Sequence, residues 1–348
     1  MHIKSLAATL FFIAAFLAAF NAQAQQSEHQ TYRVQAAMTA ADDIQAFVSI
    51  AFDGLGDRCA LLTGENPDRG EEPLPQQIVI AGSPAFNRKR IIDLREIKAS
   101  SVALDRSGEL CAVSSDRGLL FYGTTSGKLL CKNPGASGMG PVRFSPDGKS
   151  AAAVMADGRA VVITDAGTAK ATGRLRPGAG KVKTFTYSRN GDVIAVVSEK
   201  ESTDSGDYQP SLISVFSRNG RLLASLSTVD SILDCTQYGD SDCFITCGTE
   251  GLSVFSFTPL QLMNHVATGT LSSLTVSSDG RHVAVIPVMQ PYAEVYDMKT
   301  GAVEGQTRRF PDHCMALAAC PGRELVAVAF GRVALLYDLT RKMPLDEW

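Results

Sequence analysis

Apolar and polar positions recur along the chain in one repeated pattern, which is clearest from Val142 to Thr164. There a short apolar stretch enters a turn with Asp-Gly, a run of small and apolar residues follows, and a second β-rich stretch comes next. The pattern occurs seven times, and its copies align on one turn residue: Gly56, Gly108, Gly148, Gly191, Asp240, Gly280 and Gly322. Short apolar segments between turn residues predict strands, and a helical period of 3.6 fits none of them.

The residues after each turn predict burial on both faces of a strand. Positions three, four and five after the turn residue are apolar or cysteine in all seven copies. Successive strand residues face opposite sides, so such a strand must be covered on both. Repeats of about 40–50 residues with four strands each are typical of propeller blades. We therefore expect an all-β fold, a seven-bladed β-propeller of four-stranded blades. The first and fifth copies are the weakest, and losing either would leave six blades.

The two ends of the chain predict how the ring closes. The last copy runs out at Trp348 without a clear fourth strand, whereas a lone strand-like stretch, Thr31–Met38, precedes the first copy. An unpaired blade edge would leave backbone hydrogen-bonding groups open to other chains. We expect the N-terminal strand to close the ring by pairing with the last blade.

The N-terminus has the pattern of a secretory signal peptide. Lys4 precedes an apolar run from Leu6 to Phe20, and Ala22-Gln23-Ala24 then predicts cleavage between Ala24 and Gln25. The run is shorter than the roughly 20 residues that a membrane-spanning helix needs. We expect a signal peptide at 1–24, a single propeller domain at 25–348, a periplasmic or secreted location, and no membrane span in the mature chain.

Charge adds little to this description. The formal net charge is −3, and removing Lys4 with the signal peptide makes it −4. No basic excess indicates a nucleic-acid partner, and no acidic tail indicates a disordered arm.

Several turns and strand ends share a recognisable form: Phe144-Ser145-Pro146-Asp147-Gly148-Lys149, Val276-Ser277-Ser278-Asp279-Gly280-Arg281, Tyr296-Asp297 and Tyr337-Asp338. They resemble the bacterial WD40-like and TolB-like (YVTN-type) β-propeller superfamily. The resemblance covers nearly the whole mature chain, although the Trp-Asp dipeptide and Gly-His partner of the best-known members are absent. Asp-Gly is hairpin-turn chemistry, so the motif identifies a blade and not an activity. Such propellers mostly serve as docking platforms, which implies a scaffold by analogy.

Motifs for catalysis, cofactors and metals are missing. His265, His282 and His313 are isolated, with no spacing that places two ligands on one ion, so a metal site would have to be assembled from separate blades. No GxSxG elbow and no phosphate-binding glycine loop occurs. The segment Glu201–Asp207 is acidic but lacks the spacing of a calcium loop. We expect no catalytic residue, cofactor or metal.

Eight cysteines in an exported chain raise the question of disulfides. The credible bridge joins Cys235 to Cys243 or to Cys247, across the two strands of one hairpin. We expect the others to be buried thiols that act as small hydrophobes.

Two long acidic loops, Glu65–Gln77 in the first copy and Glu199–Ser211 in the fourth, and several basic links predict a binding face. Both loops join the second and third strands of a copy, and in a propeller they open on the same face as the links between blades. Basic groups in the expected links are Arg88-Lys89-Arg90, Arg174, Arg176, Lys181, Lys183 and Arg308-Arg309. Aromatic and apolar anchors often dominate binding energy. The candidate partner-binding residues are Glu65, Asp68, Glu71, Glu72, Glu199, Glu201, Asp204, Asp207, Tyr208, Met289, Tyr292, Arg308 and Arg309.

These observations favour an exported scaffold that binds a protein partner through these loops. The alternative is a propeller enzyme acting on a small molecule, such as a lactonase-like hydrolase with its site at the central channel. The sequence identifies neither the partner nor the oligomeric state.

Overall fold

The structure, a computed structural model, describes residues 30–40, 45–65, 75–86, 89–136, 138–178, 180–199 and 209–344. These residues form 28 strands and one short 3-10 turn, Pro134–Ala136, so the all-β prediction is confirmed. The expected signal peptide lies outside the described residues. Among those described, no helix is long and apolar enough to cross a membrane.

Five antiparallel sheets have four strands each, taken in chain order. The first two are β2 (Gln45–Phe52), β3 (Arg58–Glu65), β4 (Gln77–Gly82), β5 (Lys89–Asp93), and β6 (Ala99–Leu104), β7 (Leu110–Ser115), β8 (Gly118–Gly123), β9 (Leu129–Asn133). The third is β10 (Val142–Phe144), β11 (Ser150–Val154), β12 (Val161–Asp165), β13 (Ala171–Leu175). The fourth and fifth are β14 (Val182–Tyr187), β15 (Val193–Glu199), β16 (Ser211–Ser217), β17 (Leu222–Ser227), and β18 (Ile232–Gln237), β19 (Cys243–Gly248), β20 (Gly251–Ser256), β21 (Gln261–Ala267).

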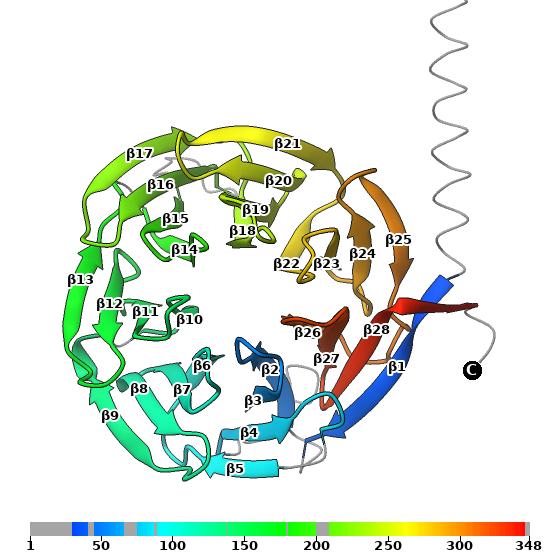
Figure 1. Cartoon of the computed structure of the whole chain (residues 1–348), viewed down its shortest axis with the longest axis horizontal. Coiled ribbons are helices and arrows are strands. Elements are labelled where there is room, and N and C mark those ends of the chain that lie inside the picture. The colour runs from blue at the N-terminus through cyan, green and yellow to red at the C-terminus, as the bar shows by residue number, and fades with distance from the viewer. Residues whose placement is uncertain are drawn as a thin grey trace, which may run out of the picture.

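The remaining strands form one eight-stranded sheet in the order β22-β23-β24-β25-β1-β28-β27-β26. Their bounds are β22 (Leu271–Val276), β23 (His282–Pro287), β24 (Glu294–Asp297), β25 (Ala302–Gln306), β26 (Cys314–Cys320), β27 (Leu325–Phe330), β28 (Val333–Pro344) and β1 (Gln30–Thr39). The sheets stand side by side in a ring, with the first strand of each group nearest the axis (Figure 1). The arrangement is consistent with a β-propeller.

The N-terminal strand closes the ring as expected. β1 runs antiparallel to β28, from Thr39 opposite Val333 to Thr31 opposite Met343. On its other side it meets β25 in parallel, at Thr31 and Gln306. Strands from the two ends of the chain therefore share one sheet, and β1 satisfies the edge that β28 would otherwise expose.

The second strand of each group is buried on both faces, as the apolar runs predict. All five residues of β11 are buried, and so are all six of β27. Neighbouring sheets pack through these strands; for example, Leu62 and Ile80 of one sheet share a cluster with Val113 and Leu120 of the next. Burying an aliphatic side chain of this size contributes about 1.5–3 kcal/mol, so packing between sheets stabilises the ring.

The Asp-Gly turns have the hairpin geometry that the sequence predicts. In the turn before β11, Ser145 Oγ donates to Asp147 Oδ1 at 2.5 Å, and the Lys149 N–H donates to the same oxygen at 3.1 Å. Gly148 has φ +70°, which favours glycine. Burial by itself would raise the pKa of Asp147, but these hydrogen bonds and Arg218, 3.0 Å away, outweigh it and lower that pKa to about 2.

The predicted disulfide is wrong, because all eight cysteines are free thiols. In the hairpin of β18 and β19, Cys235 lies opposite Thr246, and Cys247 lies opposite Asp234. Cys235 then packs in the cluster between the fourth and fifth sheets, whereas Cys243 and Cys247 pack against β22 and β23 on the other face. Burial raises the pKa of the Cys235 thiol to about 12.

Candidate functional site

The connections between strands divide the ring into two faces. Because consecutive antiparallel strands reverse direction, their connections alternate between the two ends of a sheet. We call "loop face" the one that carries the second-to-third connections and the links between groups of strands. The "turn face" carries the first-to-second and third-to-fourth turns.

The predicted acidic loops are described only at their ends. Glu65 ends β3 and is exposed. Glu199 ends β15 and forms an ion pair with Lys183 at 2.6 Å. The other candidates in these loops lie outside the described residues: Asp68, Glu71, Glu72, Glu201, Asp204, Asp207 and Tyr208.

The four remaining candidates lie in two adjoining segments of the loop face. Met289 and Tyr292 belong to the β23–β24 connection, and Arg308 and Arg309 to the link between β25 and β26. The guanidinium of Arg309 lies 5.0 Å from the centre of the Tyr292 ring. The Phe310 N–H donates to Pro291 O at 3.1 Å, so the two segments are hydrogen-bonded together. Met289 is 78% exposed.

One basic stretch does not lie where the sequence predicts it. Lys89 and Arg90 are the first residues of β5, so they lie at the end of the third-to-fourth turn of the first group and not in a link between groups. They are therefore at the turn face, and Arg88 lies outside the described residues. The error arose because β5 begins earlier than expected, which leaves 94–98 as the link.

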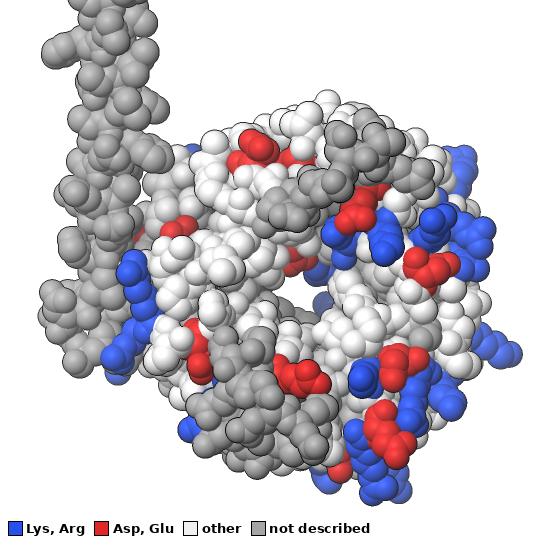
Figure 2. All heavy atoms as spheres, turned by 180° about the vertical axis from the view of Figure 1, so that it is seen from behind, with Lys and Arg blue, Asp and Glu red and all other residues white. Residues whose placement is uncertain are grey.

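Charged side chains are unevenly spread over the face shown in Figure 2. Lys, Arg, Asp and Glu gather mainly on the side of the ring that carries β9, β13 and β17, and most of them lie towards its outer rim. Two ion pairs join loop-face connections to neighbouring strands: Arg174 lies 4.0 Å from Asp157, and Lys183 lies 2.6 Å from Glu199.

A channel of about 840 Å³ lies between the first strands of the groups. Its lining combines apolar and small polar residues with five charged ones: Asp53, Arg106, Arg143, Arg189 and Asp234. Of the described residues that line it, none is histidine or cysteine.

Asp234 is the main polar centre beside this channel. Its Oδ1 accepts hydrogen bonds from Arg143 Nη2 at 3.2 Å, Thr184 Oγ1 at 3.1 Å and the Cys235 N–H at 2.8 Å. Its Oδ2 accepts from Ser273 Oγ at 3.1 Å and the Leu274 N–H at 3.4 Å. The donors come from β10, β14, β18 and β22, so one carboxylate connects four consecutive first strands.

A second polar group lies on the turn face, where Asp279, His282 and Glu324 come together from β22–β23 and β26–β27. Sequence reasoning missed both groups because their members are far apart in the chain. A signal for the second was present: His282 and Glu324 each stand two residues after the turn residue of neighbouring copies. A charged residue inside a first strand was the signal for Asp234.

Comparison with known proteins adds no family assignment. No protein-family model matches the chain, and no curated protein is significantly similar to it in sequence.

Proposed function

We propose that this chain is an exported, seven-bladed β-propeller that binds a protein partner on its loop face. The observation that carries the proposal is the patch formed by Met289, Tyr292 and Arg309. A methionine that is 78% exposed shares a connection with a tyrosine on which an arginine is stacked. Tyrosine and arginine are enriched among residues that dominate interface energies, and methionine adapts to irregular partners.

Two features support a count of seven blades. The eight-stranded sheet divides into two groups of four, β22–β25 and β26–β28 with β1, which meet in parallel only at Thr31 and Gln306. The two groups also pack face to face, since Val295 of β24 and Val328 of β27 belong to one core cluster. This division of the larger sheet, added to the five separate sheets, supports the seven blades that we propose.

The proposed location rests on the sequence. Lys4, the apolar run to Phe20 and the Ala22-Gln23-Ala24 site support export with cleavage before Gln25. The turn motifs that resemble the WD40-like and TolB-like superfamily support a docking role.

The structure gives no specific support to a hydrolase at the channel. Both carboxylate oxygens of Asp234 accept hydrogen bonds, and its charge is offset by Arg143. A general base needs a free lone pair within hydrogen-bonding reach of its substrate. Asp234 is therefore better suited to holding the first strands together.

The test is cross-linking in intact cells, followed by capture of the protein and mass spectrometry. Wild type is compared with a Tyr292→Ala/Arg309→Ala double variant. The control is Arg189→Ala, which removes an exposed arginine from the turn face. We expect one or more protein partners that survive the control and disappear in the double variant. A partner set that is the same in all three proteins would place binding elsewhere, and no reproducible partner would contradict the scaffold.

The same cells test export. Periplasmic fractionation and N-terminal sequencing should give a soluble chain that begins at Gln25. A cytoplasmic chain that keeps Lys4 would contradict this part of the proposal.

A further inference from the structure

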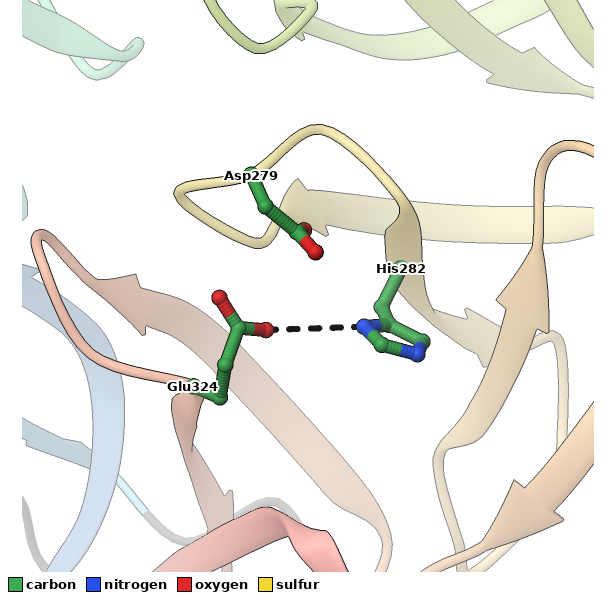
Figure 3. A group of neighbouring side chains, drawn as sticks. All are labelled: Asp279, His282 and Glu324. Atoms are coloured by element: carbon green, nitrogen blue, oxygen red, sulfur yellow. Dashed lines mark ion pairs between the residues drawn. The ribbon is translucent and has the colours of Figure 1, made fainter.

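Three potential ligands of a metal ion lie close together on the turn face, at the turns that follow the innermost strands β22 and β26. Asp279 lies in the turn between β22 and β23, His282 begins β23, and Glu324 lies in the turn between β26 and β27. One ligand atom from each lies within 4.8 Å of the others. Figure 3 shows all three side chains directed into the same space. We infer that Asp279, His282 and Glu324 bind one divalent transition-metal ion of the zinc class.

The unpartnered atoms of the cluster point to a cation. His282 Nδ1 and Glu324 Oε2 lie 3.4 Å apart, and both are buried without a hydrogen-bond partner. The His282 side chain is only 13% exposed, so water does not readily supply one. Buried polar atoms without partners cost about 1–3 kcal/mol each, so an occupant that satisfies them is favoured.

The hydrogen bond at the other ring nitrogen of His282, Nε2, indicates that the occupant must accept lone pairs. Nε2 lies 2.9 Å from Glu304 Oε2, which fits an N–H donated to that carboxylate. In the neutral ring the other nitrogen then carries a lone pair, and it faces the lone pairs of Glu324. A carboxylate that accepts the distal N–H of a metal-bound histidine is the usual second partner of such ligands.

The separation of the two atoms suits a shared ion. Zinc lies about 2.0–2.1 Å from nitrogen and oxygen ligands, so two ligands of a tetrahedral ion are about 3.4 Å apart. The Nδ1–Oε2 distance has this value. Asp279 has to approach by at most about 1.4 Å, the difference between 4.8 Å and the tetrahedral spacing, to complete a set of three protein ligands with a fourth position open to solvent. Asp279 is exposed, which provides the entry path.

The surrounding charges also favour a divalent cation. Arg281 lies 3.5 Å and Lys342 3.9 Å from Glu304 Oε1, so that carboxylate already has cationic partners. Asp279 and Glu324 accept hydrogen bonds from the hydroxyls of Ser277 and Ser278, which bring no charge. The backbone N–H of Arg281 also donates to Asp279, at 2.9 Å, while the guanidinium of Arg281 is paired with Asp297 and Glu304. With a neutral His282, these two carboxylates leave a formal charge of about −2 facing the ligand space, which one divalent ion neutralises.

The donor types decide between metals. Imidazole suits zinc, copper, iron and nickel, whereas magnesium and calcium prefer sites made only of oxygen. We therefore expect zinc to bind more tightly than manganese, and magnesium and calcium to bind weakly. A bound ion would join the inner turns of the two halves of the sheet, as β1 joins them at the perimeter.

The experiment measures zinc binding to the purified protein without a polyhistidine tag, by calorimetry and by metal analysis after dialysis. We expect one zinc ion per chain and a rise in Tm of a few degrees at saturating zinc, because the ion binds only the folded state. His282→Gln and Glu324→Gln should each weaken zinc binding by more than about 100-fold, and Glu304→Gln by about 10–100-fold.

Asp279→Asn keeps the experiment decisive if other variants fold poorly. Asn190 occupies the same place in the turn before β15, where its Oδ1 accepts from Ser188 and Asp192, so asparagine preserves the turn. Asp147→Asn is the matched control in the turn before β11. We expect zinc to raise the Tm of the control but not that of Asp279→Asn. The inference is overturned if wild type binds no zinc, or if Asp279→Asn and wild type bind it equally. In the first case a second proton on His282 would be what satisfies Glu324.

Discussion

Replacing Asp234 with alanine tests whether one carboxylate ties four first strands together. The substitution removes the acceptor for five donors, of which two are backbone N–H groups, two are hydroxyls and one is the Arg143 guanidinium. Of the two hydroxyls, that of Ser273 lies at the channel wall and can turn to water there, whereas Thr184 is buried. Arg143 keeps its hydrogen bond to Cys235 O at 2.7 Å but loses its counter-charge.

The size of the effect follows from burial. Each hydrogen bond to a charged group contributes about 1.5–3 kcal/mol net, and breaking a buried ion pair costs about 3–5 kcal/mol. The side chains of Arg143 and Asp234 are 29% and 21% exposed, so solvent offsets part of this. We expect Asp234→Ala to lower the free energy of unfolding by about 3 kcal/mol.

Urea unfolding followed by far-UV circular dichroism gives the measurement. The control is Glu96→Ala, because Glu96 and Arg117 form a pair whose side chains are 87% and 54% exposed. That change should cost at most about 0.5 kcal/mol. A double-mutant cycle with Arg143→Met should show a coupling above about 1 kcal/mol, more than exposed pairs give. An Asp234→Ala protein no less stable than Glu96→Ala would refute the role assigned to this carboxylate.

Three further predictions concern packing, protonation and thiols. Gly56→Ala should destabilise the fold by at least about 1 kcal/mol more than Gly322→Ala, as seen in thermal unfolding. Both residues have φ +71°, but a Cβ at Gly56 would lie 2.4 Å from Pro321 O whereas nothing lies near Gly322; equal losses would contradict this. Arg218→Ala should raise the pKa of Asp147 above about 2, measured by NMR. Because that pKa is depressed in the folded state, its contribution to stability is present above pH about 4 and disappears as the pH falls towards 2; an unchanged titration would exclude a role for Arg218. Buried thiols such as Cys111, whose pKa burial raises to about 12, should react with a thiol reagent only after unfolding. The two half-buried cysteines should react first, and fewer than eight thiols after unfolding would indicate a disulfide.

The hairpins were predictable because their determinants are local. An Asp-Gly turn such as that at Asp147 and Gly148 fixes the chain reversal within four residues. The apolar run that follows it then predicts a strand such as β11, buried on both faces. The closing strand was predictable because the last copy lacked a fourth strand, which would leave one strand edge unpaired, and Thr31–Met38 was the one strand-like stretch without a partner.

Details that depend on register were not predictable. The register of the β18–β19 hairpin, with Cys235 opposite Thr246 and Asp234 opposite Cys247, makes Cys235 face one neighbouring sheet and Cys247 the other, which excludes the expected bridge. A change of register by one residue moves every side chain of a strand to the other face of the sheet, and the local sequence does not predict the register. The start of β5 likewise moved Arg90 to the other face of the ring.

By itself, the sequence determined the strand class, the repeat, the turn chemistry and the pairing of the chain ends. Each of these follows from residues that are close in the chain or from the need to bury apolar runs and pair edges. Only the tertiary structure decided which polar residues meet. Arg143 and Asp234 are 91 residues apart and lie in the third and fifth groups of strands, whereas His282 and Glu324 are 42 residues apart and lie in neighbouring groups. Contacts of this kind depend on how the sheets are arranged around the axis, and that arrangement is a property of the closed ring rather than of any one copy.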